Sequence, residues 1–229
     1  MAAPDLDRVR VSQNVAASIA HELRNPVFAI ASAVQLLRYR ITDDPVIEKN
    51  LGRILRESER LNAFVAALLE YGRPAPVRLE PADPDDVWVD VLATRQGALE
   101  SKALKAEHDA PPIRARCNLD AEQLANAFTI VLDNAIEAAT PGTDLSIVSA
   151  VLPDGSWRSH LTNRGERIAQ DVLEHAFEPL VTTKHGHTGI GLAIAHRVVA
   201  DHGGTIALAS GDDSTSLTLT LPPAPAPLS

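Results

Sequence analysis

The sequence has little of several features that mark particular protein classes. Its 229 residues include a single cysteine, Cys117, so no intramolecular disulfide can form, and its place in an apparent strand favours a buried, unreactive thiol. No uninterrupted apolar run approaches the roughly 18 residues that span a membrane, and the N-terminus lacks a basic stretch followed by an apolar one. We therefore expect a soluble, cytoplasmic chain. Aromatic residues make up 3% of it, which predicts an aliphatic core.

Positive charge is also scarce. Lysine and arginine total 21 against 30 aspartate and glutamate, and the formal net charge is −9. This balance argues against a nucleic-acid partner, because affinity for a polyanion depends largely on clustered basic residues. Residues 1–75 are nearly neutral, with ten basic and nine acidic residues, so the excess lies in the remainder. An anion bound there must be held by backbone amides, a metal ion or a few placed cations.

The first seventy residues carry apolar positions at alternating steps of four and three. One series is Ala16, Ala20, Leu23, Val27, Ile30, Val34, Leu37 and Ile41, and the next is Ile47, Leu51, Ile54, Ser58, Leu61, Val65 and Leu68. The spacing predicts two long antiparallel helices, joined at residues 42–45, where Pro45 suits a first helical turn. Because two helices cannot enclose a core, we expect a homodimer in which two hairpins form a four-helix bundle.

Glycine and proline at residues 71–76 end the helical pattern, and short strands mixed with helices follow. We expect strands at 77–79, 113–117, 144–151, 156–162, 205–210 and 214–221, and helices at 85–104, 120–139 and 191–201. This pattern predicts an α+β two-layer sandwich with one sheet covered by helices. The predicted domains are the hairpin (1–72), a linker (73–76), the sandwich (77–221) and a disordered tail (222–229).

His21 is the first candidate for chemistry. It directly follows Ala20, a member of the first apolar series, and therefore lies next to the apolar face of the predicted helix. A lone helical histidine is most often an ordinary surface residue, but the neighbours of this one favour a chemical role. Glu22 could hold one ring nitrogen and leave the other free as a nucleophile, Asn25 lies one turn on, and Pro26 favours a kink.

The stretch His-Glu-Leu-Arg-Asn-Pro, residues 21–26, resembles the H-box of sensor histidine kinases. The resemblance implies that His21 accepts the γ-phosphoryl group of ATP, that Glu22 is its acid/base partner, and that Asn25 orients water during phosphatase action. It also implies a response-regulator receiver domain as partner. Asn25, Phe28, Ser32 and Gln35 follow His21 down one broad helical face, where we expect this partner to dock.

Residues 126–135, Asn-Ala-Phe-Thr-Ile-Val-Leu-Asp-Asn-Ala, resemble the N-box of the same family, although an amphipathic core helix is the simpler interpretation. The resemblance implies that Asn134 is a Mg²⁺ ligand, which its hard amide oxygen suits. The family's earlier asparagine is Ile130 here. Related ATP hydrolases of this fold place a water-activating carboxylate at this point, so Ile130 disfavours simple hydrolysis.

Residues 177–184, 188–194 and 202–204 resemble the F-box and the glycine-rich G2 box in order and spacing. A lone Gly-x-Gly is more often just a turn, but glycines before a helix let backbone amides approach phosphate. The implied nucleotide-binding residues are Lys184, Thr188, Gly189, Gly191 and Leu192. An ordinary surface lysine is the alternative for Lys184.

The remaining motif, the G1 box, is the least complete. It reads Asn163-Arg164-Gly165-Glu166-Arg167, where the family has an aspartate that accepts a hydrogen bond from adenine and two glycines. Asn163 can still accept that bond but lacks charge assistance, and Arg167 places a long side chain where the family has none.

We interpret the chain as the catalytic core of a histidine kinase that uses ATP and Mg²⁺. One alternative is a phosphotransfer or scaffold protein in which Ile130, Asn163 and Arg167 prevent productive ATP binding and another protein phosphorylates His21. A second alternative, an ATPase or binding module of the same fold, fits the unbroken apolar seams poorly.

Overall fold

The computed structural model describes residues 23, 25–38, 44–72, 76–184 and 187–225. The chain divides into two compact units. The helical unit comprises residues 1–75 with 184–190, and the sheet unit comprises residues 76–183 with 191–229. Within the described ranges, no helix combines the length and the apolar character that a membrane span requires.

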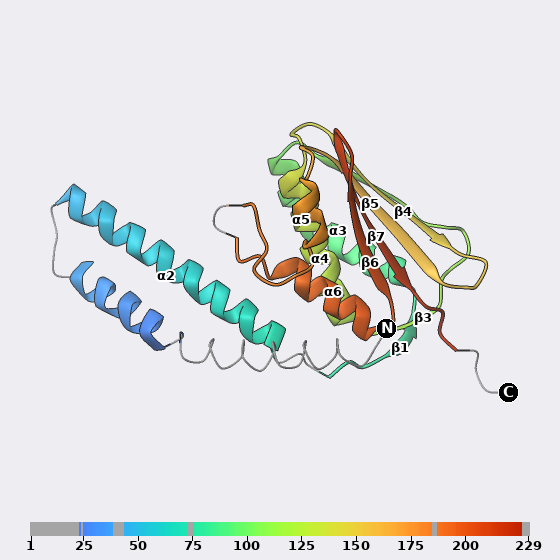
Figure 1. Cartoon of the computed structure of the whole chain (residues 1–229), viewed down its shortest axis with the longest axis horizontal. Coiled ribbons are helices and arrows are strands. Elements are labelled where there is room, and N and C mark those ends of the chain that lie inside the picture. The colour runs from blue at the N-terminus through green and yellow to red at the C-terminus, as the bar shows by residue number, and fades with distance from the viewer. Residues whose placement is uncertain (1–22, 24, 39–43, 73–75, 185–186, 226–229) are drawn as a thin grey trace. The chain divides into compact units, whose positions relative to one another are not determined.

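The helical unit contains the predicted antiparallel hairpin (Figure 1). Residues 25–38 form its first described helix, and α2 (Pro45–Gly72) is the second. Asp44 caps α2, because its Oδ1 accepts hydrogen bonds from Val46 N–H at 2.8 Å and Ile47 N–H at 3.2 Å. The predicted Pro45 therefore occupies the first helical position, which suits a residue without an N–H.

The two apolar series divide into a buried half and an exposed half. The buried members are Val27, Val34, Leu51, Ser58, Val65 and Leu68. The exposed members are Leu23, Ile30, Leu37, Ile54 and Leu61, with 38–48% of each residue accessible. Ile30, Ile54 and Leu61 line an open groove of about 520 Å³ together with Ser58. Within the described part of the hairpin, several residues of the predicted apolar series therefore stay exposed.

The sheet unit is a two-layer α/β sandwich, as predicted. Its strands are β1 (Glu80–Ala82), β2 (Lys105–Asp109), β3 (Cys117–Leu119), β4 (Asp144–Val151), β5 (Trp157–Arg164), β6 (Thr205–Ser210) and β7 (Ser214–Leu221). Its helices are α3 (Pro84–Ser101), α4 (Ala121–Ala138), α5 (Gln170–Glu174) and α6 (Gly191–Asp201). The main sheet has the order β2-β4-β5-β7-β6, in which β2 and β4 are parallel and the other neighbours antiparallel. Strands β1 and β3 form a separate antiparallel pair.

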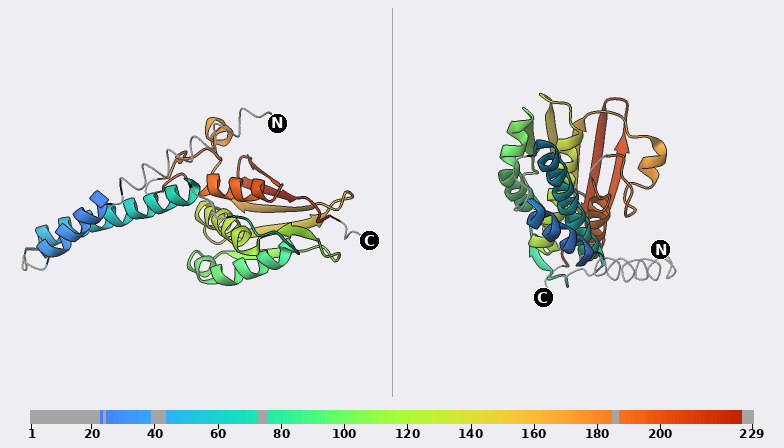
Figure 2. Two further views of the ribbon diagram at one scale, coloured as in Figure 1. Left: turned by 90° about the horizontal axis from the view of Figure 1, so that it is seen from below. Right: turned by 90° about the vertical axis from the view of Figure 1, so that its left-hand side faces the viewer.

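Helices α3, α4 and α6 cover one face of the main sheet (Figure 2). Accordingly, β4, β5 and β7 alternate buried and more accessible positions. The core is largely aliphatic, yet three aromatic rings stack at its centre. Phe128 of α4 lies between Trp88 of α3, at a centroid distance of 4.2 Å, and Trp157 of β5, at 5.9 Å. The prediction of an aliphatic core thus missed the few aromatic residues that join α3, α4 and β5.

A buried polar cluster ties α3 to the sheet beside these rings. Asp85 Oδ1 lies 3.0 Å from His108 Nε2, and Trp157 Nε1–H donates to Asp85 Oδ2 at 3.0 Å. Burial alone would raise the pKa of Asp85, but these hydrogen bonds outweigh it and hold the pKa below its ordinary value. Nearby Cys117 is buried as predicted, and burial raises the pKa of its thiol to about 11, so it stays protonated at neutral pH.

Several element boundaries differ from the prediction. Residues 77–79 are not a strand, and the pairing begins at Glu80. The strand predicted at 113–117 lies at 117–119, since Ile113 is exposed. Strand β2 was not predicted. Residues 222–225 of the predicted tail are described, and Ala224 N–H donates to Arg116 O at 2.6 Å.

Candidate functional site

The proposed phosphoacceptor lies outside the described residues, as does Glu22. Asn25 is helical and exposed, as are Phe28 and Gln35, while Ser32 is half-buried. Phe28 is accessible over 70% of its area, which is unusual for a large apolar side chain on a helix. The described part of this face therefore presents an apolar ring next to amide and hydroxyl groups.

Helix α4 carries the N-box and orients Asn134. The helix begins after Asp120, whose Oδ1 accepts Gln123 N–H at 3.1 Å. The Asn134 side chain donates from Nδ2 to Ile130 O at 2.8 Å, one turn earlier. Because the amide nitrogen is held by the helix itself, the amide oxygen is directed away from that carbonyl. Asn134 Oδ1 is a hard oxygen donor of the kind that Mg²⁺ prefers, and its role as a Mg²⁺ ligand stays a prediction.

The neighbouring carboxylate, Asp133, is engaged elsewhere. Arg95 of α3 donates to Asp133 from Nε at 2.8 Å and from Nη2 at 3.4 Å. This bidentate pair joins α3 to the exposed side of α4 and satisfies the charge of Asp133. No local pattern predicts this pair, because Arg95 and Asp133 are 38 positions apart.

The G1 segment packs against the C-terminal end of α4. Thr140 N–H donates to Arg164 O at 2.8 Å, which joins the end of the helix to β5. At Gly165 a Cβ atom would overlap Ala138 O, so only glycine allows this approach. This close packing requires glycine at position 165, independently of any family resemblance.

Asn163 lies beside this glycine on β5 and is only 4% accessible. Its Nδ2 has no hydrogen-bond partner among the described residues. A buried amide donor without a partner is costly, and such groups commonly occur where a ligand binds. Arg167 donates to Asp212 at 3.1 Å on the β6–β7 turn, and both side chains are exposed. Its guanidinium is therefore held by an acidic partner.

The segment that carries Lys184, Thr188 and Gly189 belongs to the helical unit. Gly189 has a φ of +66°, which favours glycine, and Thr188 Oγ1 accepts Ile190 N–H at 3.3 Å. Lys184 is half-buried. The other predicted nucleotide-binding residues, Asn134, Asn163, Gly165, Gly191 and Leu192, all lie in the sheet unit.

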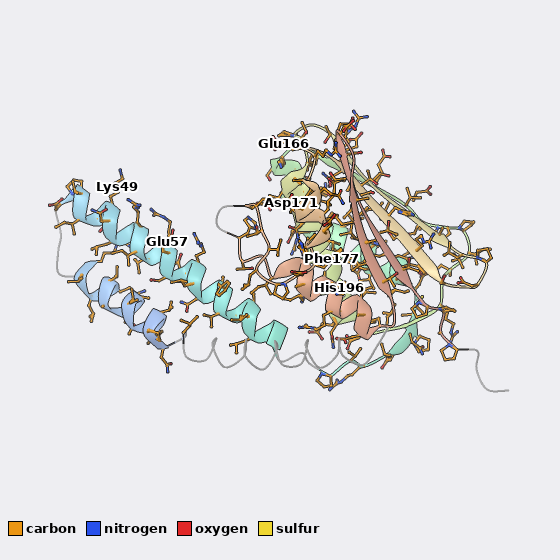
Figure 3. All side chains as sticks on the ribbon, viewed as in Figure 1. Lys49, Glu57, Glu166, Asp171, Phe177 and His196 are labelled. Atoms are coloured by element: carbon orange, nitrogen blue, oxygen red, sulfur yellow. The ribbon has the colours of Figure 1, made fainter. Side chains whose placement is uncertain are left out.

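Helix α6 begins at Gly191 and packs closely on α4. A Cβ atom at Gly191 would lie 3.2 Å from Ile130 Cγ2, tighter than most such contacts. Leu192 is half-buried in the same turn. Figure 3 shows Phe177 beside His196 of α6, and their ring centroids are 5.3 Å apart. The F-box phenylalanine thus contacts α6 at His196, and the G2 glycine at the start of α6 contacts α4 at Ile130.

Family models match both parts of the chain. The His Kinase A (phospho-acceptor) domain matches residues 12–76, and the histidine kinase-, DNA gyrase B- and HSP90-like ATPase matches residues 119–225.

Curated relatives are similar over most of this chain. Sensor histidine kinase ZraS of Klebsiella oxytoca is 29% identical over 84% of the chain, which spans 42% of that protein. Sporulation kinase E of Bacillus subtilis is 28% identical over 94% of the chain, which spans 29% of it. Signal transduction histidine-protein kinase AtoS of Escherichia coli is 29% identical over 89% of the chain, which spans 33% of it. The chain therefore spans less than half the length of each of these relatives.

Solved structures share the fold. Full-length ShkA in complex with AMPPNP matches with a TM-score of 0.72 and 19% identity, over 95% of this chain and 48% of ShkA. Histidine kinase ThkA in complex with response regulator protein TrrA matches with a TM-score of 0.71 and 21% identity, over 95% of this chain and 64% of that one.

Proposed function

Since this chain belongs to the two-component histidine kinase family, we propose that it is an ATP-dependent protein histidine kinase. It transfers the γ-phosphoryl group of ATP to His21 and then passes it to an aspartate of a response-regulator receiver domain. The observation that carries the proposal is the presence, in one chain, of a phosphoacceptor hairpin and a nucleotide-binding unit, each matched by its own family model.

Asn163 and Gly165 are the proposed base-binding residues. Gly165 lets the G1 segment lie against the end of α4, and Asn163 offers a buried amide beside it. The amide oxygen can accept a hydrogen bond from the adenine amino group. The N-terminus of α6, at Gly191 and Leu192, offers backbone amides to the phosphates, with Lys184, Thr188 and Gly189 of the preceding segment as further ligands.

The side-chain oxygen of Asn134 suits a magnesium ion. Its oxygen is a hard ligand, and Mg²⁺ in nucleotide sites takes most of its ligands from phosphates and water. Among the described residues, no cluster of three or more histidine, cysteine or acidic side chains forms a competing metal site. When bound, the ion neutralises the charge that develops on the phosphates.

The transfer itself requires a nucleophile and a proton acceptor from the hairpin. A lone pair on a ring nitrogen of His21 attacks the γ-phosphorus, the bond to the β–γ bridging oxygen breaks, and ADP leaves. Glu22 takes the proton from the other ring nitrogen, which keeps the attacking nitrogen nucleophilic. Asn25 would instead position water when the receiver domain is dephosphorylated.

In the proposed homodimer, the hairpin of the second copy covers the exposed apolar residues of the first. The groove is lined by three apolar side chains, Ile30, Ile54 and Leu61, which lie on the seam that predicts a four-helix bundle, and by the polar residues Asn50, Arg53, Glu57 and Ser58. Phe28 is the apolar anchor proposed for the receiver domain, and it is adjacent to amide and hydroxyl groups that can complete the interface.

Incubation with labelled Mg-ATP tests the function. We expect an acid-labile, base-stable phosphoryl group on His21, and none in His21→Gln, which should still bind ATP. Label on serine or threonine, or label that persists in His21→Gln, would contradict the assignment. The absence of both ATP binding and label favours the scaffold alternative, and release of free phosphate without labelled protein favours an ATPase. Asn25→Ala should retain autophosphorylation but lose phosphatase activity toward the cognate regulator.

A further inference from the structure

The chain that leaves the hairpin is tied to the first turn of α4. Arg78 N–H donates to Asp120 Oδ2 at 2.9 Å, and the Gln123 side-chain amide donates to Pro76 O at 3.4 Å. Asp120 is also the N-cap of α4, through its other carboxylate oxygen. The Arg78 N–H is the main reason why the pKa of Asp120 lies below its ordinary value. One carboxylate thus holds both the start of the helix and residues 76–78, where the linker enters the sheet unit.

His202 holds the same turn from the end of α6. It is 4% accessible, its Nε2 accepts Asp120 N–H at 2.9 Å, and its Nδ1 lies 2.7 Å from Val198 O. A carbonyl oxygen can only accept, so Nδ1 must carry the hydrogen. Since Nε2 must accept from Asp120, both bonds form only in the neutral Nδ1–H tautomer. His202 therefore joins the C-terminal end of α6 to the N-terminal end of α4.

These two helices also carry residues of the candidate site. Helix α4 holds Asn134, and α6 begins at Gly191, which packs against Ile130 of α4. The linker is consequently bound where the two helices are joined, at the ends that lie away from Asn134 and Gly191. A shift of the linker acts on both helices through this one junction.

We propose that Asp120 and His202 are positioning residues for phosphoryl transfer, because they anchor the linker to the joined ends of α4 and α6. The inference rests on the proposed kinase function. Transfer requires the γ-phosphate to meet a histidine on the other side of the linker, and such reactions depend strongly on orientation. A loosened anchor lowers the rate of transfer while the contacts to ATP remain.

Asp120→Asn separates the two roles of the carboxylate. Asparagine is an equally good N-cap, so its oxygen still accepts Gln123 N–H. Its amide nitrogen cannot accept Arg78 N–H, so the linker bond is lost, together with the 3.3 Å hydrogen bond that Asp120 Oδ2 accepts from Gln123 Nε2 in the same turn. In the full chain we expect kcat for His21 labelling to fall about fivefold, the change that one lost hydrogen bond produces. The KM for ATP should stay within about twofold.

A matched pair at His202 tests the second bond. His202→Gln places an oxygen near the Nε2 position and keeps an acceptor for Asp120 N–H. His202→Asn places an amide nitrogen near the Nδ1 position, where it can donate to Val198 O but leaves Asp120 N–H without its acceptor. We expect nearly wild-type kcat for the glutamine variant and about a fivefold loss for the asparagine variant, with KM unchanged in both.

Amide hydrogen exchange at Arg78 gives a readout that does not depend on kinase activity. Exchange should rise about fivefold in Asp120→Asn, since the bond that protects this N–H is lost. Wild-type exchange, or unchanged kcat in both asparagine variants, would overturn the anchor. A KM that rises in step with the loss of kcat would overturn it as well, because general damage to the sheet unit explains that pattern. A wild-type chain that never labels His21 defeats the kinase function instead, and the exchange result still decides whether the anchor exists.

Discussion

Asn163→Asp changes one buried atom of the proposed base site. The substitution replaces Nδ2, which lacks a partner among the described residues, with a carboxylate oxygen. A charge-assisted hydrogen bond is about twice as strong as a neutral one, so the bond to the adenine amino group should gain about 1 kcal/mol. We expect the Kd for Mg-ATP to fall about fivefold, measured by calorimetry.

The same substitution should destabilise the chain without nucleotide. Asn163 is 4% accessible, and an unpartnered buried polar group costs roughly 1–3 kcal/mol. We expect burial to raise the pKa of the new carboxyl, so the loss of stability should be largest at neutral pH and shrink as the pH falls and the group takes up a proton. The thermal midpoint should drop by about 2–4 °C for each kcal/mol, and saturating Mg-ATP should restore part of it.

Asn118→Asp is the control, since it makes the same chemical change on β3, outside the candidate site. It should leave the Kd for ATP unchanged. Weaker ATP binding by Asn163→Asp, or an equal gain in the control, would refute the assignment of Asn163 to the base.

Three further tests concern the packing of Gly165, the buried carboxylate of Asp85 and the proposed dimer interface. Gly165→Ala should weaken ATP binding and destabilise the sheet unit by roughly 1–3 kcal/mol through overlap with α4, whereas Gly97→Ala, which has open space on α3, should stabilise it by up to about 1 kcal/mol in urea unfolding. The lowered pKa of Asp85 means that its stabilising effect is present at neutral pH and lost as the pH falls below about 4, so Asp85→Asn should remove that part of the acid dependence; an unchanged stability profile would contradict this. Ile54→Glu should yield monomers by light scattering, because it places a charge among the apolar side chains of the groove, whereas Val46→Glu, which changes an exposed apolar residue of α2 outside the groove, should remain dimeric.

The sequence predicted elements well where their patterns are strong. The turn at residues 153–155 joins β4 and β5 as expected, because Gly155 has a φ of +82° and Asp154 Oδ1 accepts Ser156 N–H at 3.0 Å. Helix α6 matches its predicted bounds, since glycines flank an apolar helical pattern. Both features depend on residues close together in the chain.

Features set by distant residues were missed. Strand β2, Lys-Ala-Glu-His-Asp, has no apolar alternation, because it lies at the edge of the sheet and its His108 turns to Asp85 on α3. The hydrogen bond between Asp120 and His202 likewise follows no sequence motif, although His202 begins the segment 202–204 that resembles the family. Side-chain partners 82 positions apart are selected by packing, and local propensity carries no information about them.

The surroundings of Asn134 bear on the choice between phosphoryl transfer and hydrolysis. One turn before it, Ile130 packs toward Gly191 and offers no group that could deprotonate water. The adjacent carboxylate of Asp133 is held by Arg95 and faces the solvent-exposed side of α4. Helix α4 therefore carries the proposed metal ligand without a base at these two positions. The proposed acceptor, His21, has Glu22 beside it in the sequence as its proposed base, whereas a water molecule would find no base at these positions. The lack of a base at these positions of α4 therefore favours transfer to the hairpin over release of phosphate.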